Sequence, residues 1–183
     1  MSVLAQRTTR AAVVAPDEES SAIAQVARRL CTVAGGRVDS AEFVAAARDA
    51  WEDLPAGLRR SLRRFRRDSG HHGVLLLRNL PVGADTLGDT PMVAGSVQRE
   101  ATVAAALLLS VAAGLGDPAA FQPEKSGALV QDVVPVPGQE HVQGNVGSTQ
   151  LSFHSENAFH QHRPDYVMLL CLRADRDGVA GTL

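Results

Sequence analysis

The stretch that decides the fold is Leu151-Ser-Phe-His-Ser-Glu-Asn-Ala-Phe-His160, in which His154 and Glu156 are separated by one residue. Side chains at positions i and i+2 of a β-strand point to the same face, so a strand over residues 149–156 would bring these two side chains together. An imidazole and a carboxylate suit Fe(II), Mn(II) or Zn(II). With a second histidine they form the facial triad of non-haem Fe(II) oxygenases, which leaves positions open for a cosubstrate and O2.

The His-x-Glu triplet is a weak signal by itself, because short motifs recur by chance. An alternative is a zinc hydrolase of cupin-like shape, in which a local histidine such as His141 joins His154 and Glu156, since zinc sites commonly use three protein ligands and a water. His160 and His162 follow closely in the sequence. We expect the chain to have turned away from the metal before it reaches them.

The sequence around the triplet makes the signal more specific. Four segments contribute: residues 151–160, His162-Arg-Pro-Asp-Tyr166, Leu169-Leu-Cys-Leu-Arg173, and the preceding Gln143-Gly-Asn-Val-Gly-Ser148. Together they resemble the clavaminate synthase-like family, which includes the arginine and asparagine β-hydroxylases of antibiotic biosynthesis. The resemblance is strong over residues 131–183 and weaker over residues 22–123. It implies a double-stranded β-helix (jelly roll) and Fe(II), with 2-oxoglutarate and O2 as cosubstrates.

The resemblance also implies roles for individual residues. His154 and Glu156 correspond to two of the three iron ligands. Thr182 corresponds to a threonine that hydrogen-bonds the 2-oxoglutarate carboxylate. Gln131, Asn145 and Glu156 correspond to positions that face an amino-acid substrate. The family's distal iron-binding histidine and its 2-oxoglutarate-binding arginine have no counterpart in this sequence. We expect the enzyme to hydroxylate a free amino acid, with an arginine-like substrate as the first guess.

The predicted fold class is α+β, with a flexible tail over residues 1–16 and the N-terminal portion of one jelly-roll oxygenase domain over residues 17–183. A jelly roll has about eight strands, and only about half of them can be placed. The sequence ends in an apolar, Gly-rich run over residues 177–183. We therefore expect a fragment of a longer protein, whose missing half a second polypeptide could supply. The alternative is a degenerate family member that acts as a binding subunit without independent catalysis.

The composition argues against several other classes of protein. The net charge of −2 gives no general attraction to nucleic acid or membranes. Arginines are dense over residues 59–67, but an apolar stripe lies opposite them, as on an ordinary solvated helix. The most apolar stretch, residues 101–115, is too short to span a bilayer, and no signal peptide is visible. Cys31 and Cys171 form no disulfide framework, which agrees with a reducing cytoplasm.

Periodicity and Gly/Pro positions predict the order of the elements. Helices are expected over residues 17–34, 39–53, 55–68 and 97–113, and strands over residues 73–81, 127–134, 149–156 and 166–173. The second helix is expected to begin with a capping box of Asp39 and Glu42. A long polar loop over residues 138–148 precedes the His-x-Glu segment, and such loops often carry binding groups.

Overall fold

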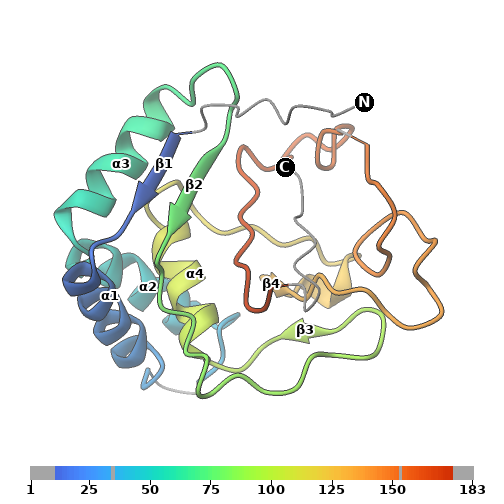
Figure 1. Cartoon of the computed structure of the whole chain (residues 1–183), viewed down its shortest axis with the longest axis horizontal. Helices are drawn as coiled ribbons and strands as arrows, with labels where there is room; N and C mark the ends of the chain where they lie inside the picture. Colours follow the sequence, from blue (N-terminus) through green and yellow to red (C-terminus); the bar gives the residue numbers. More distant parts are fainter. Residues whose placement is uncertain (1–10, 34–35, 153, 175–183) are drawn as a thin grey trace, which may run out of the picture.

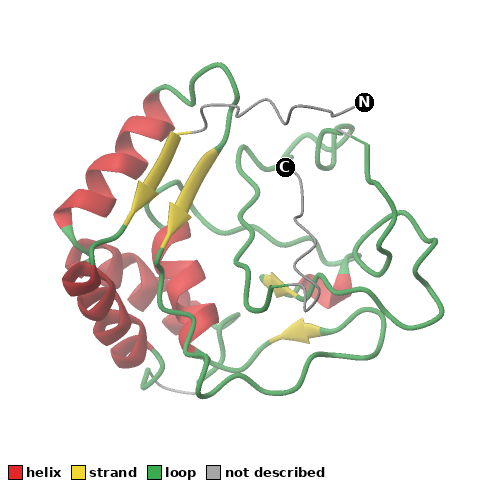
Figure 2. Cartoon of the chain, in the orientation of Figure 1, coloured by secondary structure: helices red, strands yellow, loops and turns green. Residues whose placement is uncertain are grey.

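The computed structural model describes residues 11–33, 36–152 and 154–174. Helices gather on one side of the molecule, and a loop-rich portion forms the other (Figures 1 and 2). Thr182 lies outside the described residues. The elements, in chain order, are β1 (Ala11–Val14), α1 (Asp17–Leu30), α2 (Ala41–Asp53), α3 (Ala56–Arg67), β2 (Leu75–Arg78), β3 (Val97–Gln98), α4 (Val103–Ala112), the 3-10 turn η1 (Lys125–Gly127) and β4 (Val130–Gln131).

The core lies among the four helices and extends to the β1–β2 sheet. Helix α4 is apolar around its circumference and contacts both α1 and α2, as expected for a helix buried on all sides. The amphipathic helices α1, α2 and α3 each bury one face. Fully buried residues include Ile23, Phe43, Leu62 and Leu107. Within the described ranges, no helix combines the length and apolarity needed to cross a bilayer.

The start of α2 differs by one residue from the prediction. Ser40, and not Asp39, is the N-cap, and its hydroxyl accepts a hydrogen bond from the Phe43 backbone N–H at 3.1 Å. Asp39 instead forms ion pairs with Arg37 and Arg99. The long-range contact with Arg99 explains the difference, because it holds the Asp39 carboxylate away from the N-terminus of the helix.

The predicted helix over residues 97–113 was wrong in its first six residues. Val97 and Gln98 form β3, which pairs antiparallel with β4. The helix begins after Thr102, whose hydroxyl accepts a hydrogen bond from the Ala105 backbone N–H at 3.2 Å. Pairing with a strand about thirty residues later in the chain therefore overrides the local helical pattern.

The tail prediction was wrong for residues 11–14. They form β1, which pairs in parallel with β2 in the register Ala11–Leu75. The predicted strands over residues 149–156 and 166–173 are not formed in the parts of these ranges that the structure describes. The described strands make two two-stranded sheets, β1–β2 and β3–β4. The α+β class is confirmed, whereas the jelly roll is not visible in this pairing.

A glycine after α4 allows the helix end to pack against α2. A Cβ placed on Gly114 would overlap the ring of Trp51, which is almost fully buried. We expect Gly114→Ala to lower the free energy of unfolding by about 1–3 kcal/mol, because a buried indole has little room to shift. Gly116→Ala is the matched control, since a Cβ there meets no atom within 4 Å. Equal stability of the two variants in chemical denaturation would contradict this account.

Candidate metal centre

His154 and Glu156 lie close together, although no strand holds them. The Nε2 atom of His154 lies 3.7 Å from Oε2 of Glu156. Both side chains are about half exposed, at 52% and 47%. The convergence predicted from the spacing therefore occurs, but it arises in an irregular segment and not on a paired strand.

A backbone hydrogen bond sets the tautomer of His154. Its Nδ1 atom lies 2.9 Å from the carbonyl oxygen of Ser152. A carbonyl oxygen can only accept, so Nδ1 carries the proton and donates it. In the neutral imidazole the other ring nitrogen, Nε2, is the one left to accept or to bind a metal, and it is the nitrogen that lies 3.7 Å from Oε2 of Glu156. Metal-binding histidines commonly use this arrangement, in which the other ring nitrogen donates to a carbonyl or carboxylate.

The separation of the two donor atoms is close to that required by one metal ion. Bond lengths of about 2.1 Å and donor angles between 90° and 109° place two ligand atoms roughly 3.0–3.4 Å apart. The observed 3.7 Å exceeds this range by only a few tenths of an ångström. A neutral imidazole with a carboxylate is also a suitable donor pair for Fe(II). The residues present therefore fit two positions of a non-haem iron site.

Nearby histidines do not complete the site. In the part of the chain that the structure describes, no cluster of three or more His, Cys, Asp or Glu side chains could hold a metal ion. His160 packs edge-on against Phe121, with ring centroids 4.7 Å apart, and its Nδ1 accepts a hydrogen bond from the His162 backbone N–H. This geometry argues against the zinc alternative, which needed His141 or another local histidine beside His154.

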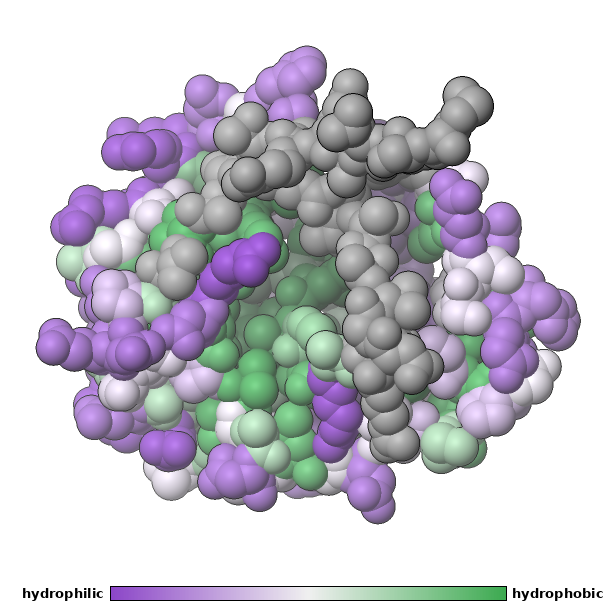
Figure 3. Space-filling model, in the orientation of Figure 1, coloured by the Kyte–Doolittle hydropathy of each residue, from purple (hydrophilic) through white to green (hydrophobic). Residues whose placement is uncertain are grey.

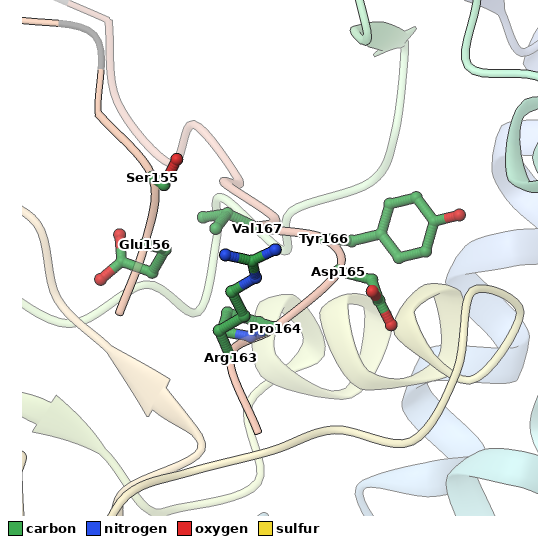
Figure 4. A pocket seen from close by; sticks show the side chains of 7 residues that line it. All are labelled: Ser155, Glu156, Arg163, Pro164, Asp165, Tyr166 and Val167. Atoms are coloured by element: carbon green, nitrogen blue, oxygen red, sulfur yellow. The ribbon is translucent and has the colours of Figure 1, made fainter. Parts of the chain in front are cut away.

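The chain returns to Glu156 after these histidines. A cavity of about 410 Å³ is lined by residues 155–156 and 163–167. In Figure 4 the guanidinium of Arg163 lies between Glu156 and Asp165, whose carboxylates point to opposite sides. No pattern in the sequence predicted that residues 163–167 line the same cavity as Glu156. Pro164 indicates a turn at this point, because a proline after the histidines favours a change of chain direction.

Gln131 and Asn145 lie on segments that hydrogen-bond to each other. The Val134 backbone N–H donates to the Asn145 carbonyl oxygen at 3.0 Å, and the Val136 N–H donates to the Val146 carbonyl oxygen at 2.8 Å. The Gln131 side chain is half-buried and donates to the Ala128 carbonyl oxygen at 3.5 Å. The Asn145 side chain is exposed. The fold thus brings together the two segments predicted to face the substrate.

The single lysine of the chain secures this region. The Nζ atom of Lys125 donates to the carbonyl oxygens of Ser96 and Asp132, at 3.3 Å and 3.1 Å. It therefore ties the start of β3 to the end of β4, a role that no pattern in the sequence predicted. Its backbone has a positive φ of 44°, a conformation that costs energy in a non-glycine residue and persists only where surrounding contacts hold it.

The polar loop over residues 138–148 is also held by hydrogen bonds. The Glu140 carboxylate accepts from the Gly138 backbone N–H at 2.9 Å, and this bond holds the pKa of Glu140 below its ordinary value. The bond favours the folded loop above the ordinary pKa of a glutamate, and this contribution is lost as the pH falls through the lowered value. The Ser148 N–H donates to the Glu140 carbonyl oxygen at 2.9 Å, which closes the loop just before the His154 segment.

The proteins that this chain resembles in sequence and in fold include iron oxygenases. The chain is 61% identical, over 169 residues, to an L-asparagine oxygenase of Streptomyces coelicolor; the match covers 92% of this chain and 51% of that protein. It is 36% identical over 148 residues to clavaminate synthase 2 of Streptomyces clavuligerus, covering 80% of this chain and 46% of that protein. The chain thus spans about half the length of these relatives.

Solved structures agree with this likeness. A crystal structure of asparagine oxygenase superposes with a TM-score of 0.88 at 60% identity, covering 93% of this chain and 54% of that one. The non-heme iron oxygenase OrfP, in complex with Fe and alpha-ketoglutaric acid, superposes with a TM-score of 0.73 at 29% identity, covering 84% of this chain and 49% of that one. The resemblance to the clavaminate synthase-like proteins is therefore confirmed.

A family-level match covers most of the chain, including the His154–Glu156 segment. Residues 39–181 match the family described as taurine catabolism dioxygenase TauD, TfdA family. This range begins just before α2 and includes the core helix α4 and the candidate metal ligands. The chain belongs to the TauD/TfdA dioxygenase family.

Proposed function

We propose that this chain is the N-terminal part of an Fe(II)/2-oxoglutarate-dependent oxygenase that hydroxylates a free amino acid. Its fold would be completed as a jelly roll, with residues 17–183 forming one portion of that domain. His154 and Glu156 would hold the iron, and Thr182 would bind the 2-oxoglutarate carboxylate. The observation that carries the proposal is the Ser152–His154 hydrogen bond, which makes Nδ1 the donor and leaves Nε2 as the ring nitrogen for a metal, 3.7 Å from the Glu156 carboxylate.

The chemistry divides between the bound groups and the protein. Fe(II) with 2-oxoglutarate and O2 would supply the oxidising power when bound, whereas the protein positions the reacting C–H bond. The Ser152 carbonyl oxygen orients His154 by accepting a hydrogen bond from its Nδ1–H. Glu156 contributes negative charge to the site and lines the cavity next to it. Arg163, which lines the same cavity, supplies a positive charge that can attract a carboxylate.

We propose L-asparagine as the first substrate to test, in place of the arginine-like substrate suggested by the sequence. The support is the 61% identity to the Streptomyces coelicolor L-asparagine oxygenase. Other relatives act on different amino acids: one is an enduracididine beta-hydroxylase at 37% identity, and another is an L-ornithine/L-arginine 3-hydroxylase at 34%. Gln131 and Asn145 would hydrogen-bond the polar groups of the substrate.

Anaerobic titration with Fe(II) and 2-oxoglutarate tests the proposed function. Iron with chelated 2-oxoglutarate gives a visible charge-transfer band, which zinc does not give. We expect the band when the chain is co-expressed with the second half of an asparagine oxygenase, because the described residues supply only two ligands. Turnover would then be followed as O2- and 2-oxoglutarate-dependent hydroxylation of L-asparagine, with L-arginine as the comparison substrate.

The other outcomes of the titration have definite meanings. A band from this chain alone would mean that a residue within it completes the site. Absence of the band in both preparations would refute the oxygenase assignment and favour the alternative, a degenerate family member that acts as a binding subunit. A zinc-loaded protein with hydrolytic activity and no response to 2-oxoglutarate would also refute it.

A further inference from the structure

Three consecutive residues of η1 have a left-handed backbone. The φ angles of Lys125, Ser126 and Gly127 are 44°, 54° and 69°. Glycine adopts this conformation freely, whereas in lysine and serine the Cβ atom makes it unfavourable. Two strained residues in succession persist only where surrounding contacts hold them, and such strain clusters at functional sites. Other parts of the chain therefore have to hold this turn.

The guanidinium of Arg99 holds the turn. Its Nη2 atom donates to the carbonyl oxygens of Lys125 and Ser126, at 3.3 Å and 3.0 Å. Its Nη1 atom donates to the carboxylate of Asp39, with which it forms an ion pair. The side chains of Arg99 and Asp39 are only 28% and 13% exposed, so salt screens this pair little. One planar guanidinium thus bonds a carboxylate and two backbone carbonyls at once.

The backbone of Arg99 is anchored as well. Its carbonyl oxygen accepts a hydrogen bond from the Val38 N–H at 3.0 Å, beside the bridge between Arg37 and Glu100. Asp39 precedes α2 on the helical side, whereas Arg99 follows β3 in the loop-rich portion (Figure 1). On the face drawn in Figure 3, an apolar hollow lies between these two sides of the molecule. The Asp39–Arg99 pair therefore joins the turn to the helical side.

Hydrogen bonds continue from the turn to Gln131. The Lys125 carbonyl oxygen, which Arg99 contacts, also accepts from the Ala128 backbone N–H at 3.3 Å. The Ala128 carbonyl oxygen accepts from the Gln131 side chain at 3.5 Å. The Lys125 ammonium donates to the carbonyl oxygen of Asp132, the residue next to Gln131, at 3.1 Å. The turn that Arg99 holds therefore contacts both the side chain of Gln131 and the backbone beside it.

We propose that Arg99 is a positioning residue for substrate binding. Together with Asp39 it holds η1 in the left-handed conformation, and the turn in its place fixes the position from which Gln131 binds the amino acid. This role rests on the proposed function, in which Gln131 hydrogen-bonds the substrate. Loss of Arg99 is expected to weaken amino-acid binding and to leave the iron affinity, which depends on His154 and Glu156, nearly unchanged.

Lys125 gives a direct measure of the turn, because it is the only lysine in the 183-residue chain. A lysine-specific protease therefore cuts the complete chain at one peptide bond, inside η1, and the rate follows how often the turn opens. We expect Arg99→Ala to be cleaved at least about 10-fold faster than the unaltered chain, because two carbonyls lose a charged donor. Arg29→Ala is the matched control. It removes a guanidinium from an exposed ion pair with Asp53, and we expect it to change the rate less than about 2-fold.

A glycine substitution separates the hold on the turn from general damage to the fold. Ser126→Gly keeps the carbonyl that Arg99 contacts and removes the Cβ atom that makes a positive φ costly. In the Arg99→Ala chain it is expected to slow cleavage at least about 3-fold. Absence of this rescue would overturn the proposal, because Arg99 would then not be opposing strain in the turn.

Asp39→Asn covers the case in which Arg99→Ala does not fold. The change is nearly isosteric, and it removes the charge that orients the guanidinium. It is expected to speed cleavage at Lys125 at least about 3-fold. If the folded Asp39→Asn chain and, where it folds, Arg99→Ala were cleaved as slowly as Arg29→Ala, the proposal would be wrong.

Kinetics in the preparation co-expressed with the second half of an asparagine oxygenase tests the link to the substrate. Arg99→Ala is expected to raise KM for L-asparagine at least about 10-fold. The Fe(II)/2-oxoglutarate band is expected to titrate within about 2-fold of the unaltered protein, because the turn lies outside the His154–Glu156 segment. Loss of the band together with substrate binding would overturn the proposal, since Arg99 would then support the whole site and not Gln131.

The proposed function and the role of Arg99 fail in different ways. Normal turnover with an unchanged KM, in an Arg99→Ala variant whose turn is readily cleaved, would keep the function and overturn the positioning role. Absence of both the band and turnover in the unaltered preparation would refute the function, and the role of Arg99 in substrate binding would fall with it. The protease experiment on the chain alone would then still show whether Arg99 holds the turn.

Discussion

Replacing His154 by alanine is expected to abolish the Fe(II)/2-oxoglutarate band and amino-acid hydroxylation in the preparation that shows them. The variant loses the Nε2 donor that lies 3.7 Å from Glu156. Loss of a group that merely supports a metal ligand typically costs 10–100-fold in metal affinity or activity, so loss of the ligand itself should exceed about 100-fold. Anaerobic titration and a hydroxylation assay measure the two effects separately.

His162→Ala is the matched control for this experiment. His162 lies eight residues further along the chain, is exposed, and contacts the side chain of Gln161. Its replacement removes an imidazole from the same region, but it is expected to change iron affinity less than about 3-fold. If His162→Ala removed the band and His154→Ala kept it, the assignment of the ligand would be wrong. Circular dichroism of both variants would establish that neither change unfolds the chain.

Replacing Phe43 by alanine is expected to lower the free energy of unfolding by about 3–5 kcal/mol. Phe43 has no solvent exposure and belongs to the core shared by the four helices. Its backbone N–H, which donates to the Ser40 hydroxyl, is retained in the variant. The loss therefore comes from packing: the transfer free energy of the ring and the cavity that it leaves. For a chain of 183 residues, this corresponds to a fall in Tm of roughly 6–20 °C.

Arg60→Ala tests whether the effect of Phe43→Ala reflects burial. Arg60 is exposed on α3, and its truncation removes a long side chain without opening a cavity. Surface substitutions of this kind usually change stability by less than about 0.5 kcal/mol. Similar denaturation midpoints for Arg60→Ala and Phe43→Ala would show that the core assigned to α2 is not the one that stabilises the protein.

Local patterns in the sequence predicted the helices well. The predicted and observed bounds of α3 differ by about one residue at each end, and α1 begins at the predicted residue, Asp17. Helices depend on contacts three and four residues apart, so their signals are local. The His154–Glu156 pair and the sequence around it were likewise sufficient to identify the family, because a motif is a property of consecutive residues.

The strands were predicted poorly for a physical reason. A strand exists only where a partner supplies its hydrogen bonds, and that partner can be remote in sequence. Pairing with β2 turned part of the predicted tail into β1, and pairing with β4 turned the predicted helix start into β3. Residues 166–171 kept the period-two burial of a strand, but no ladder involves them in the described structure.

The sequence by itself therefore determined the helices, the family and the identity of the candidate ligands, because these depend on residue type and short-range spacing. Only the tertiary structure decided where those residues lie and what they contact. It placed the Ser152 carbonyl against His154, returned residues 163–167 to the cavity beside Glu156, and left Val167 and Leu169 exposed. Each of these features depends on where the chain lies in space, and a local sequence pattern carries little information about that position.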